Sequence, residues 1–266
     1  MLDRYNRKIN YLRISVTDRC NLRCTYCMPE EGIALLRHKD ILTYDEIRDF
    51  TMAAVKAGVT KVRITGGEPL VRKGVVTLVG MIAGINSIRD LSMTTNGVLL
   101  KQFAPELKAA GLQRINISLD TLDPVKFRAI TRTGDINDVL EGIRAAGNAG
   151  LHPIKINCVI KKSKQEEDAV AVTRFCKDNG LEIRYITQMD LVKGHFSLVE
   201  GGTGGNCALC NRLRLTANGK LKPCLFSNLE FDIRELGYES ALKLAVESKP
   251  ECGSKNETGA FYNIGG

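Results

Sequence analysis

Short apolar runs alternate with longer segments of helical periodicity through the first two-thirds of the chain. Six of these runs are rich in β-branched or apolar residues and have the length of strands. The predicted strands are Tyr11–Val16, Lys61–Thr65, Asp90–Thr94, Gln113–Leu119, Ile154–Ile160 and Glu182–Ile186. Most positions in them are apolar, as expected of parallel strands that are buried on both faces.

The segments between these strands carry helix-start and helix-stop signals. Thr43 precedes the predicted helix Tyr44–Ala57, and Glu46 follows three residues later, which is the pattern of a capping box. Glycine follows each of the other predicted helices, where a left-handed residue commonly ends a helix. These helices are Gln102–Ala110 before Gly111, Asp138–Ala149 before Gly150, and Gln165–Asn179 before Gly180.

This alternation predicts an α/β fold with a parallel sheet and right-handed crossovers. Both an open doubly wound sheet and a partial barrel satisfy the pattern, and in both the functional groups gather where strands end. From about Met189 the composition changes, and residues 193–206 are rich in glycine and small residues. We therefore predict a main domain over residues 1–190 and a small appendix over residues 191–266, reached through a flexible linker.

Composition favours a folded enzyme without a membrane segment. Hydrophobic residues make up 44% of the chain and charged residues 26%, as in ordinary globular proteins. No apolar run approaches the ~18–20 residues of a membrane span, and the N-terminus is charged where a signal peptide would be apolar. We expect a cytoplasmic location. The net charge of +8 indicates an acidic partner, and the scattered basic residues favour a nucleotide-sized anion at least as much as nucleic acid.

Nine cysteines without a secretion signal indicate metal binding rather than a disulfide framework. Cys20, Cys24 and Cys27 form a C-x₃-C-x₂-C group directly after a predicted strand. Four-iron clusters normally take four cysteines, so three thiolates on one loop would leave one iron for an exchangeable ligand. A zinc site that lacks a local fourth ligand is the alternative.

This motif, the strand before it and Tyr26 resemble the radical S-adenosylmethionine superfamily. The resemblance implies a partial (βα)6 TIM-type barrel in which the open iron binds S-adenosylmethionine. One electron, from an external donor through the cluster, then cleaves the cofactor and yields a 5′-deoxyadenosyl radical. Besides Tyr26, the positions that match the family's cofactor-binding elements are Gly66, Gly67, Glu68, Thr94, Asn96 and Ser118. Taken alone, Thr-Asn-Gly is also a turn signal and Ser-Leu-Asp a cap signal.

A second group, Cys207, Cys210 and Cys224, has the spacing C-x₂-C-x₁₃-C. Arg212 and Arg214 alternate on a predicted strand between these cysteines, so both side chains point to the same face. Asn218-Gly219 then predicts a hairpin turn. Since Arg offers bidentate donors to phosphate, the segment predicts an anion or nucleotide pocket beside a metal. A structural zinc site completed by Cys252 or His195 is the alternative.

Longer segments resemble the GTP 3′,8-cyclase family of molybdenum-cofactor biosynthesis. They are VTDRCNLRCTYCMP, KVRITGGEPL, RINISLD, CNRLRLTANGKLKPCLF and the terminal Gly265-Gly266. The resemblance implies a lyase with two 4Fe-4S clusters, the second of which binds the guanine base of GTP. The radical would abstract the ribose 3′ hydrogen to start molybdopterin precursor synthesis. The family's basic substrate contacts fall on Arg13, Lys61, Arg63, Lys155, Arg184, Arg212 and Arg214.

The chain departs from this family in two places. The stretch between Arg184 and Cys207 is much shorter, and Thr187-Gln188 stand where the family has a glutamate and an aromatic residue. The tail between Cys224 and the final Gly-Gly is also short. A related twitch-type radical enzyme acting on another nucleotide, metabolite or peptide is therefore the main alternative. A zinc-stabilised nucleic-acid-binding protein is disfavoured, because it would have no use for the Gly-Gly-Glu-Pro motif. A homodimer is compatible with the sequence.

Three cysteines fall outside both groups. Cys158 and Cys176 lie in apolar contexts, which predicts that they are core thiols. Cys252 has no predicted role.

Overall fold

The computed structural model describes residues 1–189 and 197–253. His195 and the terminal Gly265-Gly266, both named above, lie outside the described residues.

Within the described residues the strands form one nine-stranded sheet in the order β6-β5-β4-β3-β2-β1-β7-β8-β9. The strands β1 to β6 are parallel and follow one another in chain order, and β7 continues the parallel arrangement on the other side of β1. The first six strands are β1 (Tyr11–Ser15), β2 (Lys61–Thr65), β3 (Asp90–Thr95), β4 (Arg114–Ser118), β5 (Ile154–Ile160) and β6 (Glu182–Thr187).

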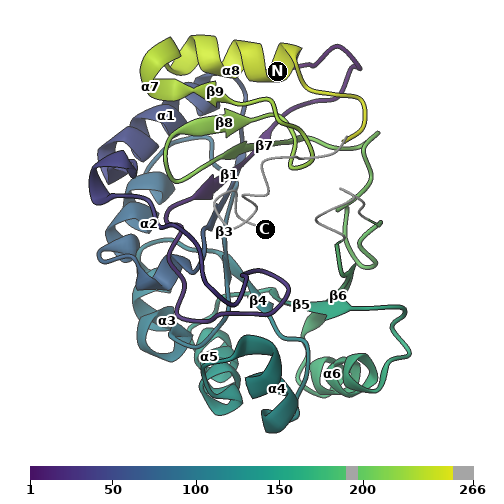
Figure 1. Ribbon diagram of the computed structural model, residues 1–266. Coiled ribbons are helices and arrows are strands. Elements are labelled where there is room, and N and C mark those ends of the chain that lie inside the picture. The colour runs from purple at the N-terminus through teal and green to yellow at the C-terminus, as the bar shows by residue number, and fades with distance from the viewer. Residues whose placement is uncertain (190–196, 254–266) are drawn as a thin grey trace.

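Among the described residues, helices cover the outer side of this curved sheet and none covers its inner side (Figure 1). The α-helices are α1 (Tyr44–Lys56), α2 (Val75–Ala83), α3 (Leu100–Ala109), α4 (Pro124–Thr131), α5 (Ile136–Asn148), α6 (Glu167–Asp178), α7 (Ile233–Leu236) and α8 (Tyr238–Glu247). Two short 3-10 helices are η1 (His38–Asp40) and η2 (Pro69–Val71). Sequential strand order with helices on one side is the arrangement of a partial barrel, as predicted, and not of a doubly wound sheet.

The predicted helix ends are confirmed. The Thr43 hydroxyl accepts from the Glu46 amide at 3.2 Å, and the Glu46 carboxylate accepts from the Thr43 amide at 2.7 Å, which completes the capping box. Gly111, Gly150 and Gly180 all have positive φ, of 99°, 76° and 64° respectively. Helices α2, α4, α7 and α8 were not predicted from the sequence.

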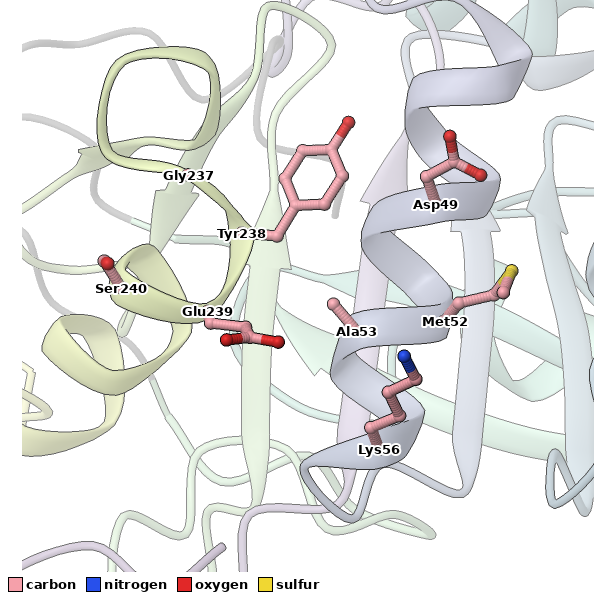
Figure 2. Close-up of a pocket in the computed structure, with 8 residues that line it drawn as sticks. All are labelled: Asp49, Met52, Ala53, Lys56, Gly237, Tyr238, Glu239 and Ser240. Carbon is pink, nitrogen blue, oxygen red and sulfur yellow. The ribbon is translucent and has the colours of Figure 1, made fainter.

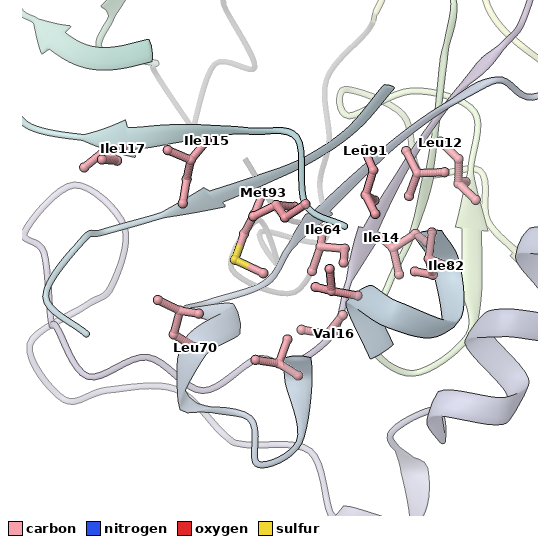
Figure 3. Close-up of a cluster of buried hydrophobic side chains, with 14 of the residues drawn as sticks. Leu12, Ile14, Val16, Ile64, Leu70, Ile82, Leu91, Met93, Ile115 and Ile117 are labelled. Atoms are coloured by element: carbon pink, nitrogen blue, oxygen red, sulfur yellow. The ribbon is translucent and has the colours of Figure 1, made fainter. Parts of the chain in front are cut away.

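The barrel strands alternate between apolar and polar residues, so the expectation of strands buried in apolar surroundings on both faces was wrong. Leu12 and Ile14 of β1 point toward the helices and are fully buried, whereas Tyr11, Arg13 and Ser15 point to the inner face. The outward residues of β1 to β4 pack with η2 and α2 in one apolar cluster (Figure 3). The labelled members are Leu12, Ile14, Val16, Ile64, Leu70, Ile82, Leu91, Met93, Ile115 and Ile117.

The C-terminal strands extend the same sheet. They are β7 (Arg212–Leu215), β8 (Lys220–Lys222) and β9 (Phe231–Asp232), and β7 pairs in parallel with β1, which sets Arg214 opposite Arg13. The hairpin predicted at Asn218-Gly219 joins β7 to β8, and Gly219 has a φ of 85°. The division into two domains stays a prediction. No helix in the parts of the chain that the structure describes is both long and apolar enough to cross a membrane.

Candidate active site

The first cysteine group lies on a loop that follows β1 and is anchored to the end of α4. The Arg23 and Thr25 amides donate to the carbonyl oxygens of Thr131 and Ile130 at 3.0 and 2.9 Å. Arg132, just after α4, donates from Nη1 to two carbonyl oxygens of the loop at 3.0 Å each. This anchoring sets the positions of Cys20, Cys24 and Cys27 independently of any bound group.

The three thiols are close enough to affect one another's ionisation; Cys20 and Cys24 are half-buried and Cys27 is exposed. Burial raises the pKa of Cys24 to about 12, and the neighbouring Cys27 and Cys20 thiols act in the same direction. Burial and Cys20 likewise raise the pKa of Cys27 to about 12. Sulfurs that disfavour one another's negative charge fit a group that brings positive charge, as the irons of a cluster do.

Two predicted cofactor-binding residues, Tyr26 on the loop and Asn96 after β3, connect the loop to the strand ends. Tyr26 donates its hydroxyl to Oδ2 of Asp120 at 2.7 Å, and Oδ1 of the same carboxylate accepts from the Val159 amide at 2.8 Å. Asn96 donates from Nδ2 to Oδ1 of Asn21 at 2.8 Å and lies 3.8 Å from the sulfur of Cys20. The carboxyl ends of β3, β4 and β5 are thereby linked to the cysteine loop. Asp120 belongs to the Ser-Leu-Asp strand end noted above, but no role of its own was predicted for it from the sequence.

Thr94 and Ser118 lie on the inner face near the ends of β3 and β4. Thr94 is in register with Asn116, and Ser118 with Asn157 of β5, so the four residues form two successive polar rows on this face. The Thr94 hydroxyl is buried and has no hydrogen-bond partner among the described residues. Buried hydroxyls are normally paired, so Thr94 fits a role as a ligand contact.

Glu68 is buried and connects the ends of two strands. Its carboxylate accepts from the Leu70 amide at 3.0 Å, from the Thr95 hydroxyl at 2.8 Å and from the Asn96 amide at 2.7 Å. Burial raises the pKa of Glu68 to about 7, although the three donors act against this rise. The carboxylate thus holds the end of β2 to the end of β3, next to the cysteine loop. A direct contact to a cofactor ammonium stays a prediction.

Gly66 and Gly67 are explained by close approach of two backbones. The Gly67 amide donates to the Thr17 carbonyl at 2.7 Å, and the Glu68 amide donates to that of Arg19 at 2.8 Å. A Cβ on Gly66 would stand 2.8 Å from the Thr17 oxygen, and one on Gly67 would stand 2.8 Å from the carbonyl carbon of Arg19. The glycines therefore let the segment that leads to Cys20 dock on the end of β2.

Gly67→Ala is expected to destabilise the protein and to lower the iron content of the first site. Overpacking of a close contact typically costs about 1–3 kcal/mol, and here both partners are backbone. Gly80→Ala is the matched control, because a Cβ at Gly80 in α2 meets nothing within 4 Å and alanine should stabilise a helix by about 0.5–1 kcal/mol. Urea unfolding and iron analysis measure both effects. Equal unfolding midpoints for the two variants would contradict the explanation.

Guanidinium groups line the inner face of the barrel. The Tyr11 ring lies between Arg13 and Arg63, with each guanidinium carbon 5.6 Å from the ring centroid. Burial lowers the pKa of Arg63 and of Arg214 to about 9 in each case, and the nearby Arg13 acts in the same direction on both. Burial and further arginines also lower the pKa of Arg184. Such crowding is costly without an anion.

Unpaired polar atoms concentrate on the same face. Within residues 1–189 and 197–253, the buried side-chain atoms without a hydrogen-bond partner include Tyr11 Oη, Arg13 Nε, Arg114 Nη1 and Arg184 Nε. Buried donors in such numbers fit a polyanionic ligand, since few native polar groups stay unpaired in the absence of a ligand or water.

The predicted basic residues do not all occupy equivalent places. Lys155 lies on the inner face and forms an ion pair with Glu182, whereas Lys61 is exposed at the start of β2. Arg114 was missed by the sequence analysis. The Asp90 carboxylate accepts from Nε and Nη2 of Arg114 at 2.8 and 2.7 Å, and Nη1 of Arg114 is the unpaired nitrogen named above. The signal was available, because Arg114 has the same parity on β4 as Asn116.

The second cysteine group lies at the start of β7, where the Cys210 amide donates to the Cys207 carbonyl at 3.1 Å. Burial acts to raise the pKa of Cys210, but the charges of Lys249 and Arg212 outweigh it and lower the pKa to about 7. A thiolate at neutral pH is the form that binds metal. The Cys210 and Cys224 thiols also act on the pKa of Arg214, so the cysteine group adjoins the basic face.

Neither cysteine group is arranged around a single ion. In the described part of the chain, no three cysteine, histidine or carboxylate side chains are placed so that they could hold one metal ion. Cysteines of a four-iron cluster each bind a different iron, so their sulfurs stand further apart than the ligands of one ion.

Lys249 supports the second group from a distant part of the sequence. Its buried Nζ donates to the carbonyl oxygens of Arg212 at 2.8 Å and of Pro223 at 2.5 Å. Arg212 lies two residues after Cys210, and Pro223 directly precedes Cys224. No sequence pattern marked this lysine.

Lys249→Met is expected to lower the unfolding free energy and the iron content of the second site. Two buried carbonyl oxygens would lose their donor, at about 1–3 kcal/mol for each unsatisfied group. Lys243→Met on α8 is the control, because the Lys243 side chain is 75% exposed. Urea unfolding and iron analysis should show a loss for Lys249→Met only. An unchanged iron content would contradict the supporting role.

One pocket lies on the outside of the molecule between α1 and α8 (Figure 2). It is lined by Asp49, Met52, Ala53, Lys56, Gly237, Tyr238, Glu239 and Ser240. None of these is a predicted site residue, and Phe50 and Tyr238 form an edge-to-face ring contact between these two helices. We therefore place the candidate active site on the inner face of the barrel.

Comparisons with known proteins concern the family and the fold of the chain. Residues 14–176 match the family model for the radical SAM superfamily, and residues 154–254 match the model described as Molybdenum Cofactor Synthesis C. The structure of SuiB from Streptococcus suis bound to S-adenosylmethionine superposes with a TM-score of 0.61, at 15% identity, over 97% of this chain and 70% of that one. This likeness concerns the fold.

Curated relatives are considerably more similar in sequence. GTP 3′,8-cyclase of Thermodesulfovibrio yellowstonii is 45% identical over 89% of this chain and 88% of the relative. GTP 3′,8-cyclase of Geobacter sulfurreducens is 39% identical over all of this chain and 99% of the relative. That alignment extends over 324 positions whereas this chain has 266 residues, so the relative has segments that this chain lacks. By its family models and its relatives, this chain belongs to the radical S-adenosylmethionine superfamily and, within it, to the GTP 3′,8-cyclase family.

Proposed function

We propose that this protein is a GTP 3′,8-cyclase, a radical lyase that acts on GTP at the start of molybdopterin precursor synthesis. The observation that carries the proposal is the basic lining of the inner face, on which Arg13, Arg114 and Arg184 keep buried nitrogens without a hydrogen-bond partner among the described residues. The pairing of β1 with β7 sets Tyr11 opposite Arg212 and Arg13 opposite Arg214. The amino end of β1 is therefore beside the second cysteine group, and its carboxyl end leads to the first.

The cysteines would hold the metal centres. Cys20, Cys24 and Cys27 would bind one four-iron cluster, and Cys207, Cys210 and Cys224 a second. When bound, the clusters and S-adenosylmethionine would supply the 5′-deoxyadenosyl radical that takes the ribose 3′ hydrogen of GTP. The protein's own contribution is to hold cofactor and substrate in reach of one another and to compensate charge.

Residues around the first cysteine group would orient S-adenosylmethionine. The Tyr26–Asp120 hydrogen bond and the Asn96 contact to the loop keep the strand ends against the cysteines. Thr94 offers an unpaired hydroxyl, and Ser118 ends the neighbouring strand β4. We propose that Glu68, Gly66 and Gly67 shape this site through the strand ends that they hold together, and that Glu68 also accepts from the cofactor ammonium.

The basic face would bind the triphosphate. The proposed contacts are Arg13, Arg63, Arg184, Arg212 and Arg214, and the electrostatic interactions among these arginines support their proximity. Guanidinium groups suit it because they donate to phosphate in pairs and stay charged when buried. Lys155 would exchange its partner Glu182 for phosphate, and Lys61 would contribute at the rim of the face.

The direct test is turnover under strictly anoxic conditions. Protein reconstituted with iron and sulfide would receive a chemical reductant, S-adenosylmethionine and GTP, with the reductant standing in for the external electron donor. The expected products are 5′-deoxyadenosine and a cyclised nucleotide in equal amounts. Deoxyadenosine without a nucleotide product would indicate that the protein is a related radical enzyme with another substrate. Failure to bind iron at either cysteine group would overturn it.

A homodimer and a cytoplasmic location stay predictions. Light scattering of the reconstituted protein tests the former, and fractionation of the source cells tests the latter.

A further inference from the structure

The segment that follows α8 is fixed against the second cysteine group by one buried arginine. Nη1 of Arg7 donates to the carbonyl oxygens of Cys207 at 2.8 Å and of Glu251 at 2.9 Å, and Nη2 donates to that of Pro250 at 2.7 Å. Asp3 holds Nε of the same guanidinium at 2.6 Å. Because one nitrogen binds both segments, Cys207 and the residue before Cys252 are held side by side.

Cys252 lies beside a predicted cluster ligand. The Cys207 and Cys252 thiols are close enough to interact directly. Cys158 and Cys176, the other two cysteines outside the metal groups, are buried in the core as predicted, whereas Cys252 is exposed. A packing role therefore explains Cys158 and Cys176 but not Cys252.

Cys252 lies where it could supply the fourth cysteine that the second group lacks. A four-iron cluster normally takes four cysteines, and the second group supplies three. Cys252 comes from a different segment, but Arg7 and Lys249 tie that segment to three backbone carbonyl oxygens of the group, those of Cys207, Arg212 and Pro223. Its exposure leaves the thiol free to turn toward a metal without repacking the core.

We propose that Cys252 is a fourth cysteine ligand of the second cluster and binds its remaining iron in the substrate-free protein. This inference rests on the proposed function, which places a cluster on Cys207, Cys210 and Cys224. On binding iron the thiol gives its proton to solvent, and it takes a proton back when another ligand replaces it. The exchange involves no oxidation or reduction.

The test uses the full chain with Cys20, Cys24 and Cys27 all replaced by alanine, so that only the second site is filled. The variant would be reconstituted anoxically with Mössbauer-active iron and sulfide, and iron and sulfide would be quantified. Iodoacetamide labelling followed by peptide mass spectrometry then gives the alkylation rate of Cys252 with and without the cluster. We expect alkylation to be at least about tenfold slower in the loaded protein, because an iron-bound thiolate is not a free nucleophile. Addition of GTP should restore the faster rate.

A second readout separates ligation from simple shielding. In the same background, Cys252→Ser should retain the cluster but show one iron with distinct Mössbauer parameters before GTP is added, whereas Cys176→Ala should not. A loaded cluster with Cys252 alkylated at the metal-free rate would overturn the inference and leave the proposed function intact. Failure to assemble any cluster at the second site would overturn both.

Discussion

Replacing Cys24 with serine is expected to abolish the cleavage of S-adenosylmethionine. Cys24 lies at the centre of the first cysteine loop, where the Cys27 and Met28 amides both donate to its carbonyl oxygen at 3.0 Å. Without this thiolate the cluster loses one of its three protein ligands, and the step that generates the radical is lost with it. Formation of 5′-deoxyadenosine should fall at least about a million-fold, the lower end of typical enzymatic rate enhancements.

The iron content distinguishes this effect from general unfolding. The variant should retain the second cluster, so iron should fall from about eight to about four atoms per chain, the change expected for one of two four-iron clusters. Cys176→Ala is the control, because Cys176 lies buried on α6 away from both groups and should keep all the iron. A Cys24→Ser protein with full iron content and unchanged deoxyadenosine formation would refute the assignment of the first site.

Replacing Arg63 with methionine is expected to weaken GTP binding and, at the same time, to stabilise the protein. Arg63 is only 5% exposed, and its Nε makes a hydrogen bond of 3.3 Å to the Ser92 hydroxyl. Hydrogen bonds to charged groups contribute about 1.5–3 kcal/mol, so affinity should fall roughly 10–100-fold. Replacing buried charge with an apolar side chain of similar volume often stabilises by about 1–4 kcal/mol.

Calorimetric titration with GTP and thermal unfolding of the substrate-free protein measure the two effects of Arg63→Met. Arg144→Met is the matched control, since Arg144 is exposed on α5 and should change neither quantity. Opposite signs for binding and stability are the signature of a charge kept for a ligand. A variant that unfolds at lower temperature and binds GTP as well as the parent would assign Arg63 a structural role instead.

The residues to which the sequence analysis assigned no role of their own share one property. Asp120, Arg114, Lys249 and Arg7 act through contacts to chain segments far from them in sequence, such as the 200 residues between Arg7 and Cys207. The predicted cluster cysteines and the glycines of the Gly-Gly-Glu motif lie in contiguous motifs, because a cluster loop and a glycine turn each need several groups within a few positions. Spacing along the chain records such local requirements and does not record which distant backbone a side chain will support.

Short-range interactions were sufficient to predict the strands, the capped helix at Thr43 and both cysteine groups. Hydrophobic periodicity, caps and ligand spacing act over a few residues, and the alternation of strand and helix leaves few topologies open. The polar inner face, the pairing of β7 with β1 and the position of Cys252 required the folded chain. They depend on which strands meet and on where no helix covers the sheet. That outcome is settled by the packing of the whole sheet, because burial of its apolar face on the helices leaves the opposite face to arginines and, as we propose, to their anion.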